Sequence, residues 1–230
     1  MEKRFDALIF DLDGVLIETV EAHRRAWEIV ARHLGRSLDD ATALRLRGRP
    51  REACLDILLE GRATSGPVEC AKLLEWKDSL YKEQVARLGR KVRCVGAQNI
   101  LWAARRESFK LAIASASRNA PLLLELAQFD GEFDHISDGA FAGPPKPSPS
   151  QLQSIARKLA VSAERCLLFE DSASGLEAAS AAGMPAVAVA LSGTQIACAN
   201  IHNLAELATR LEKSGTLEGA LAHLLGKAPK

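Results

Sequence analysis

The segment Asp11-Leu12-Asp13-Gly14 carries two carboxylates two residues apart, directly after the short apolar run Ala7–Phe10. Alternate residues of an extended or turning backbone point the same way, so both carboxylates should leave the end of a strand together. Two such groups can act as a nucleophile and a general acid/base, or they can hold a hard cation. The alternative is an ordinary turn, because Asp-Gly is a common turn pair.

A hydroxyl and a lysine follow later in the chain. Ser115 opens the segment Ser115-Ala-Ser-Arg-Asn119, which closes the apolar run Leu111–Ala114 and precedes a helical pattern. Hydroxyls and free backbone N–H groups at a helix start can bind an anion, although this segment could equally be a simple helix cap. Lys146 lies within Pro144–Pro149, where prolines fix φ and so hold one ammonium group in place. Its alternative is a solvated loop lysine.

A second acidic pair, Glu170 and Asp171, directly follows the apolar run Cys166–Phe169. Ser174 and Glu177 fit a capping box for the next helix, but this leaves the two acids unexplained. Acids at two strand ends could together bind magnesium through their oxygens. An acid pair, a hydroxyl, a lysine and a second acid pair form a complete set for phosphoryl transfer, because magnesium and lysine neutralise the phosphoryl oxygens that carboxylates alone would repel.

The elements that position these residues alternate along much of the chain. Short apolar runs typical of strands buried on both faces are Ala7–Phe10, Leu111–Ala114, Cys166–Phe169 and Ala186–Val189. Helical patterns cover Ala97–Glu107, Ala120–Gln128, Ser150–Leu159 and Ala173–Ala182. The alternation predicts an α/β fold with a doubly wound parallel sheet, a Rossmann-like core whose functional loops gather at the carboxyl ends of the strands.

From about Thr19 to Lys91 the pattern is helical throughout and contains no buried-strand run. We expect an inserted all-helical cap domain here, and its best helices are Glu21–Leu34, Glu52–Glu60 and Val68–Leu88. The predicted division is a Rossmann-like catalytic core of residues 1–15 and 96–230 and a helical cap domain of residues 16–95. The two crossings, near Val15–Glu18 and Val92–Gly96, are hinge candidates because a glycine lies beside each.

The composition is that of an ordinary globular protein, with 47% hydrophobic and 26% charged residues. A net charge of +1 argues against nucleic acid as a partner. The cysteines are scattered and predict neither a disulfide framework nor a zinc site: Cys54, Cys70, Cys94, Cys166 and Cys198. No signal peptide and no apolar stretch of about 20 residues is evident, so we expect a cytoplasmic protein without a membrane partner.

Together these residues carry a family resemblance. Asp11-x-Asp13-Gly14, Ser115, Lys146 and Glu170-Asp171 resemble, in order and strand context, the motifs of the haloacid-dehalogenase-like phosphotransferase superfamily. Within it the chain is similar to the beta-phosphoglucomutase group with a small helical cap. The closer similarities are Asp11-Leu-Asp-Gly-Val15, His23-Arg-Arg-Ala-Trp27, Gly48-x-x-Arg51-Glu52, Ser115-Ala-Ser-Arg-Asn119 and Glu170-Asp-Ser172. The resemblance covers roughly Phe5 to Leu191, and the tail after it is uninformative.

The resemblance implies a role for each matching position. Asp11 would be the nucleophile that forms an aspartyl-phosphate, and Asp13 the general acid/base. Mg²⁺ would be held by Asp11, the Asp13 backbone carbonyl, Glu170 and Asp171. Ser115 and Lys146 would hold the transferring phosphoryl group. In the cap, His23 would assist Asp13 and Arg51 would bind the substrate's non-reacting phosphate. The remaining substrate-binding candidates are Trp27, Gly48, Ser117, Arg118 and Asn119.

Departures from the family pattern bear on the substrate. Arg118 stands where close relatives have lysine, Glu18 where they usually have aspartate and Val95 where proline is usual. Arginine and lysine are not interchangeable at a phosphate or sugar contact.

Dehalogenation is rejected because Asp13 supplies the acid that dehalogenases lack, and phosphonate cleavage is disfavoured because Arg51 stands where it requires a lysine. The expected activity is a phosphohexomutase of beta-phosphoglucomutase type. The alternatives are a sugar-phosphate phosphatase and, less favoured, a non-catalytic phospholigand-binding module. A small phosphorylated sugar is the expected ligand, and a monomer the expected state.

Overall fold

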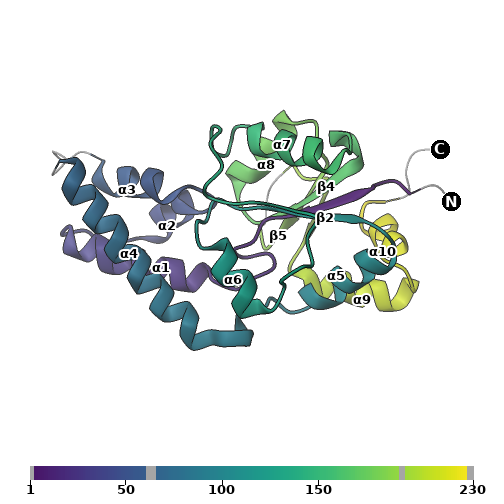
Figure 1. Cartoon of the computed structure of the whole chain (residues 1–230), viewed down its shortest axis with the longest axis horizontal. Helices are drawn as coiled ribbons and strands as arrows, with labels where there is room; N and C mark the ends of the chain where they lie inside the picture. The colour runs from purple at the N-terminus through teal and green to yellow at the C-terminus, as the bar shows by residue number, and fades with distance from the viewer. Residues whose placement is uncertain (1–2, 61–65, 192–194, 227–230) are drawn as a thin grey trace.

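A parallel six-stranded sheet forms the centre of the molecule (Figure 1), in the order β3-β2-β1-β4-β5-β6. The computed structural model describes residues 3–60, 66–191 and 195–226. The strands are β1 (Ala7–Phe10), β2 (Lys110–Ala114), β3 (His135–Ser137), β4 (Cys166–Glu170), β5 (Ala186–Val189) and β6 (Ala199–Ile201). β1 lies between β2 and β4, where Phe10 pairs with Ile113 and Phe169. The strand order reverses at β1, and this is where α/β sheets form their binding crevices.

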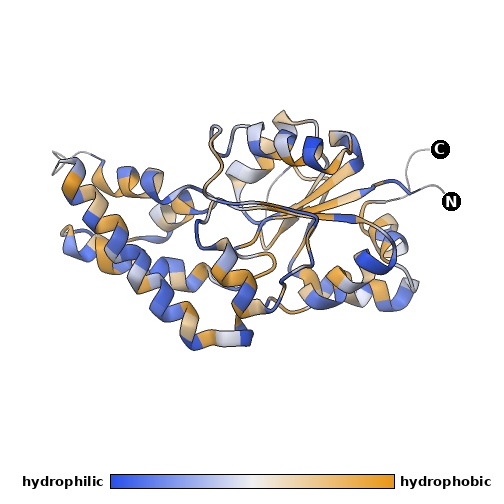
Figure 2. Cartoon of the chain, viewed as in Figure 1, coloured by the Kyte–Doolittle hydropathy of each residue, from blue (hydrophilic) through white to orange (hydrophobic). Residues whose placement is uncertain are grey.

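Helices cover both faces of the sheet because successive strand residues point to opposite sides. Leu8 and Phe10 pack in one hydrophobic cluster with α5 (Ala97–Arg106), α6 (Ala120–Ala127), α9 (Leu204–Ser214) and α10 (Leu217–Leu224). Ala7 and Ile9 pack in another with α7 (Ser150–Leu159) and α8 (Ala173–Ala181). Figure 2 shows the strands as an apolar layer between helices whose outer faces are hydrophilic. The predicted doubly wound α/β fold is therefore confirmed.

Within the described part of the core, the elements that the sequence missed are β3, β6, α9, α10 and a short 3₁₀ helix at Ala163–Arg165. β3 and β6 span three residues each and contain exposed side chains, so neither forms the continuous apolar run by which the other strands were found. α9 and α10 follow Leu191, in the tail that the family pattern did not cover. Both pack against the sheet through buried leucines, Leu204 and Leu217 among them. The tail thus completes one face of the core.

The helical insertion lies beyond the carboxyl ends of the strands (Figure 1). It contains α1 (Val20–His33), α2 (Asp40–Leu46), α3 (Arg51–Leu59), α4 (Pro67–Leu88) and a short 3₁₀ helix at Gly89–Val92. Trp27, Val30, Leu55 and Leu58 form a hydrophobic cluster inside it. The sequence missed α2 because this helix has seven residues and a single buried one. The expected helical insertion is confirmed, and its boundaries at residues 16 and 95 stay a prediction.

The two crossings between insertion and core lie side by side. The Glu18 N–H donates to the Val92 carbonyl at 2.7 Å and the Cys94 N–H to the Leu16 carbonyl at 2.9 Å. Ile17 forms an antiparallel bridge with Arg93. Any movement of the cap must therefore bend both crossings together.

The thiols of Cys54, Cys94, Cys166 and Cys198 are free. Among the described residues, no helix is both long and apolar enough to span a membrane.

Candidate active site

Three adjacent strands deliver the predicted chemistry to one edge of the sheet. Asp11 follows β1, Ser115 follows β2, and Glu170 ends β4 with Asp171 directly after it. Asp11 extends the sheet by one bond, because its N–H donates to the Phe169 carbonyl at 2.9 Å. The candidate residues that the sequence placed after separate strands therefore lie at one edge of the sheet, as the parallel topology requires.

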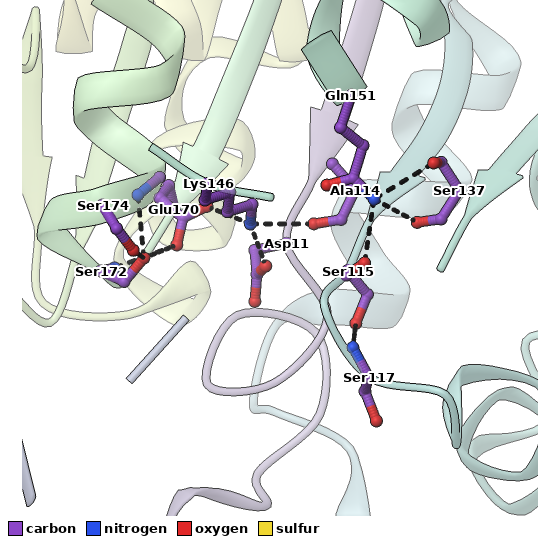
Figure 3. Close-up of polar contacts among 11 residues, drawn as sticks. Asp11, Ala114, Ser115, Ser117, Ser137, Lys146, Gln151, Glu170, Ser172 and Ser174 are labelled. Carbon is purple, nitrogen blue, oxygen red and sulfur yellow. Dashed lines mark hydrogen bonds and ion pairs between the residues drawn. The ribbon is translucent and has the colours of Figure 1, made fainter. Parts of the chain in front are cut away.

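Lys146 forms the centre of this cluster (Figure 3). Its Nζ lies 2.6 Å from Asp11 Oδ1, 2.7 Å from Glu170 Oε2 and 3.0 Å from the Ala114 carbonyl oxygen. The lysine belongs to the proline-rich loop after β3 and is 3% exposed. It is therefore not the solvated loop lysine that the sequence left as the alternative. Its ammonium group therefore neutralises two buried carboxylates at once.

The buried charges shift each other's pKa values. Burial raises the pKa of Asp11 well above its usual value, and the Lys146 charge opposes this effect. The pKa of Lys146 is raised because the carboxylates of Asp11 and Glu170 outweigh the cost of its burial. Burial and the neighbouring Glu170 raise the pKa of Asp171 to about 7, against the opposing effect of Arg47. Three carboxylates of this cluster face only two cationic side chains, Lys146 and Arg47. This excess of acidic groups favours the binding of a further cation.

The donor set fits a hard divalent cation. Asp11, Glu170 and Asp171 each offer a carboxylate oxygen, and these atoms lie within 4.8 Å of one another. Carboxylate oxygens are the ligands that Mg²⁺ and Ca²⁺ take. Gly14, with φ of +84°, lets the backbone pass this group, since a Cβ there would lie 2.1 Å from Asp171 Oδ2.

Hydrogen bonds hold Glu170 and the loop after it. The Ser172 N–H and hydroxyl donate to Glu170 Oε1 at 3.0 and 2.6 Å. The Ser172 hydroxyl also caps α8 by accepting from the Gly175 N–H at 3.1 Å. The capping box predicted at Ser174 and Glu177 is therefore wrong, because the helix begins at Ala173 and Ser174 already lies inside its first turn.

Ser115 is 1% exposed and is fixed through its backbone. Gln151, which the sequence did not single out, donates from Nε2 to the carbonyls of Ser115 at 2.9 Å and Ser137 at 3.2 Å (Figure 3). The Ser115 hydroxyl accepts from the Ser117 N–H at 3.0 Å, and the Ser117 hydroxyl from the Asn119 N–H at 3.2 Å. These turns hold the hydroxyls at the start of α6, where an anion site was predicted.

Asp13 lies two residues after Asp11 of the acidic cluster and is held by contacts from the cap side. Its Oδ1 accepts hydrogen bonds from the Thr19 hydroxyl and, at 3.3 Å, from the Tyr81 hydroxyl. His23 Nε2 also lies 3.3 Å from this oxygen. Burial alone would raise the pKa of Asp13, but its contacts with His23 and Thr19 outweigh it, so the pKa is lowered. Asp13 is therefore a carboxylate at neutral pH.

Lys77 of α4 is a buried lysine that the sequence did not reveal. It is 3% exposed, and its Nζ lies 2.9 Å from His23 Nδ1 and 4.8 Å from the centre of the Tyr81 ring. Burial and the Lys77 charge lower the pKa of His23. A neutral His23 then accepts from Lys77 at Nδ1 and donates from Nε2 to Asp13, which makes a chain from α4 to the acid/base candidate.

Burial also lowers the pKa of Lys77 to about 8, from 10.5. Between these values the unfolded chain keeps a proton that the folded protein has lost, so this lysine should make the free energy of unfolding rise with pH. The full rise is about 3 kcal/mol, at about 1.4 kcal/mol per pKa unit. We expect urea denaturation from pH 7 to 10.5 to show it as a difference between wild type and Lys77→Met. A constant difference across this range would contradict the buried ammonium.

A cavity of about 540 Å³ opens between cap and core above these groups. It is lined by the predicted residues Asp11, Asp13, His23, Trp27, Gly48, Arg51, Ser115, Ser117, Arg118, Asn119 and Asp171. Of the predicted site residues, Lys146 and Glu170 are outside this lining, and Lys146 binds both Asp11 and Glu170. Trp27 is 4% exposed and packs mainly in the hydrophobic cluster of the cap, so only a small part of it faces the cavity.

Charged residues of cap and core also meet in the lining of this cavity. Arg51 Nε lies 3.3 Å from Glu52 Oε1, and Arg118 approaches the same oxygen at 3.4 Å. Asp78, also missed from the sequence, accepts from Asn119 Nδ2 at 2.7 Å and lies 3.9 Å from Arg51. The cap is thus closed on the core by the chain's own ion pairs.

Comparison with known proteins identifies the family. The model of the haloacid dehalogenase-like hydrolases matches residues 5–183. The chain belongs to this family. A beta-phosphoglucomutase of Bacillus subtilis (strain 168) is 34% identical over 186 residues, covering 80% of this chain and 82% of that protein. A fructose-1-phosphate phosphatase of Escherichia coli (strain K12) is 31% identical over 193 residues, covering 83% of this chain and 100% of that one.

The fold agrees with this assignment to the haloacid dehalogenase-like hydrolases. The crystal structure of a beta-phosphoglucomutase from Clostridium difficile superimposes with a TM-score of 0.83 at 26% identity, covering 95% of this chain and 98% of that one. The family and fold expected from the motifs are confirmed, and the relatives include both a mutase and a phosphatase of phosphorylated sugars.

Proposed function

We propose that this protein is a Mg²⁺-dependent phosphohexomutase of beta-phosphoglucomutase type, working through an aspartyl-phosphate on Asp11. The observation that carries the proposal is one cavity lined both by Asp11, Asp13 and Asp171, which belong to or adjoin the acidic cluster, and by the cationic residues Arg51 and Arg118. A small phosphorylated sugar as substrate, the cytoplasm as location and a monomeric state belong to the same proposal.

Asp11 is proposed as the nucleophile because it lines the cavity and Lys146 binds one of its carboxylate oxygens. The Lys146 charge opposes the effect of burial on Asp11, and Lys146 and the Ser115 hydroxyl would hold the phosphoryl oxygens. A divalent cation on Asp11, Glu170 and Asp171, with the Asp13 carbonyl, would supply charge neutralisation for the transferring group.

Asp13 would move the proton. As a carboxylate it accepts the proton of the attacking sugar hydroxyl while the phosphoryl group leaves Asp11, so that one P–O bond forms and one breaks. The resulting bisphosphate reorients, its other phosphoryl group passes to Asp11, and Asp13 returns the proton to the sugar oxygen. His23 and Lys77 would hold Asp13 in place through both steps.

Arg51, together with His23, favours the mutase over the phosphatase alternative, which discharges phospho-Asp11 to water. A reorienting bisphosphate needs a site for the phosphate that is not reacting, and Arg51, Arg118 and Asn119 form a cationic, hydrogen-bonding group for it. The phosphatase remains the second candidate because the Escherichia coli relative aligns over its full length.

Replacing Arg51 with alanine is expected to slow isomerisation far more than hydrolysis of the phosphoenzyme. Charge-assisted contacts to the distal phosphate, at about 1.5–3 kcal/mol, would bias cap closure by roughly ten- to a hundred-fold. Isomer formation and free phosphate should both be measured for a panel of hexose 1-phosphates, including glucose 1-phosphate of each anomer, with magnesium and a trace of bisphosphate.

Arg24→Ala is the matched control, because Arg24 lines the same cavity but pairs with Glu28 and Asp40. The mutase proposal fails if wild type releases only free phosphate from every hexose phosphate, or if Arg51→Ala leaves isomerisation unchanged. The first result would establish the phosphatase in its place.

A further inference from the structure

Arg47 reaches from the cap to Asp171, one of the three acids of the core that could hold a metal ion. It directly follows α2, and its guanidinium lies 2.5 Å from Asp171 Oδ2. The Asp171 side chain is 5% exposed, so this ion pair is shielded from water on the carboxylate side. No sequence pattern had singled out Arg47, and neither the proposed nucleophilic step nor the proton transfer uses it.

The backbone next to Arg47 fits closely against the core. Gly48 has a φ of +69°, and a Cβ there would lie 2.3 Å from the Ser172 hydroxyl oxygen. The cap loop can therefore approach the loop after β4 only with glycine at this position. This contact fixes where Arg47 enters the core, and among the described residues its buried Nε has no hydrogen-bond partner. The guanidinium is thus held at Asp171 by one strong contact.

The cations of the site are divided between its carboxylates. Lys146 forms its ion pairs with Asp11 and Glu170. Arg47 is the cation bound to Asp171, and Asp171 is one of the three acids that could hold a metal. A divalent cation placed on Asp171 would stand next to the guanidinium, and two positive groups sharing one carboxylate repel each other.

We propose that Arg47 is a cap-borne competitor of the metal ion: it occupies Asp171 when the metal is absent and leaves when the metal binds. The inference rests on the proposed metal-dependent function, which supplies the ion. Because coupling between two binding events is reciprocal, metal binding should loosen the cap loop, and docking of that loop should weaken metal binding.

Metal affinity tests the competition directly. The full-length protein, stripped with chelator, would be titrated with Mn²⁺ as a paramagnetic stand-in for Mg²⁺ and followed by electron paramagnetic resonance. We expect Arg47→Ala and Arg47→Gln to lower the Mn²⁺ dissociation constant about ten-fold or more, the size typical of a charge-assisted contact. Arg47→Lys, which keeps the charge, should stay within about three-fold of wild type.

Arg49→Ala is the matched control, since Arg49 is an exposed arginine that lines the same cavity two residues further on. If Arg49→Ala tightens Mn²⁺ binding as much as Arg47→Ala does, the effect comes from the general loss of positive charge and the inference is wrong. Hydrogen exchange provides a second measurement. Mg²⁺ should speed amide exchange in the loop around Gly48 in wild type and have no such effect in Arg47→Ala.

The possible results separate the inference from the function on which it rests. If Asp171→Asn abolishes Mn²⁺ binding but Arg47→Ala binds the ion like wild type, the metal site stands and the competition by Arg47 is wrong. If wild type and Arg47→Ala both fail to bind Mn²⁺ at all, the metal-dependent function is wrong as well. Tighter binding in Arg47→Ala and Arg47→Gln, but not in Arg49→Ala, establishes the competition.

Discussion

Replacing Asp11 with asparagine or alanine is expected to abolish turnover and covalent labelling by phosphate, while the protein still folds. Only a carboxylate oxygen can attack phosphorus and form the acyl phosphate, so no residual pathway through this position remains. Folding should survive because burial disfavours the charged form of Asp11, and Lys146 keeps its contacts with Glu170 and the Ala114 carbonyl.

The labelled intermediate gives the sharpest measurement. Wild type would be mixed with a sugar bisphosphate carrying labelled phosphate, quenched in acid and examined by mass spectrometry for one phosphoryl group on the peptide containing Asp11. Asp40→Asn is a suitable control, because Asp40 lines the same cavity with an exposed carboxylate. Phosphate bound covalently to Asp11→Ala would refute the assignment of the nucleophile.

The sequence predicted the structure best where a continuous apolar strand is followed directly by an acidic residue. β1, β4 and β5 are continuous apolar runs buried on both faces, so their bounds could be predicted to within one residue. Asp11 and Asp171 follow two of these strands directly, and parallel topology then brings them to the same edge. The core of the site therefore required no knowledge of tertiary contacts.

The residues that the sequence missed depend on contacts between distant segments. Lys77 lies on a helix with several other charged residues, and nothing in the local pattern shows that it is the buried one. Its burial results from the packing of α4 against α1, which brings it to His23, 54 positions away. Arg47 is recognisable only once the cap loop is seen against the core, 124 positions from Asp171. Charged residues of this kind carry no periodic signal, so only the three-dimensional structure identifies them.

The cap-side contacts of Asp13 make asparagine the most informative replacement there. Thr19 and Tyr81 donate to Oδ1, and the amide oxygen of asparagine can accept the same hydrogen bonds. Asp13→Asn therefore removes the charge and the proton acceptor but keeps the oxygen that these groups need. Alanine would leave buried donors without a partner and would mix a loss of stability with the loss of catalysis.

Asp13→Asn is expected to slow both transfer of the phosphoryl group from Asp11 to the sugar and its return, each by about 10²–10⁴-fold, the usual contribution of general acid/base catalysis. Single-turnover experiments with phosphorylated enzyme should show a long-lived aspartyl-phosphate, because no carboxylate takes the proton of the attacking hydroxyl. Tyr81→Phe is the control, since it removes one donor at 3.3 Å and leaves the carboxylate in place, so it should cost far less. An Asp13→Asn enzyme that turns over within about three-fold of wild type would show that Asp13 positions the loop and does not move the proton.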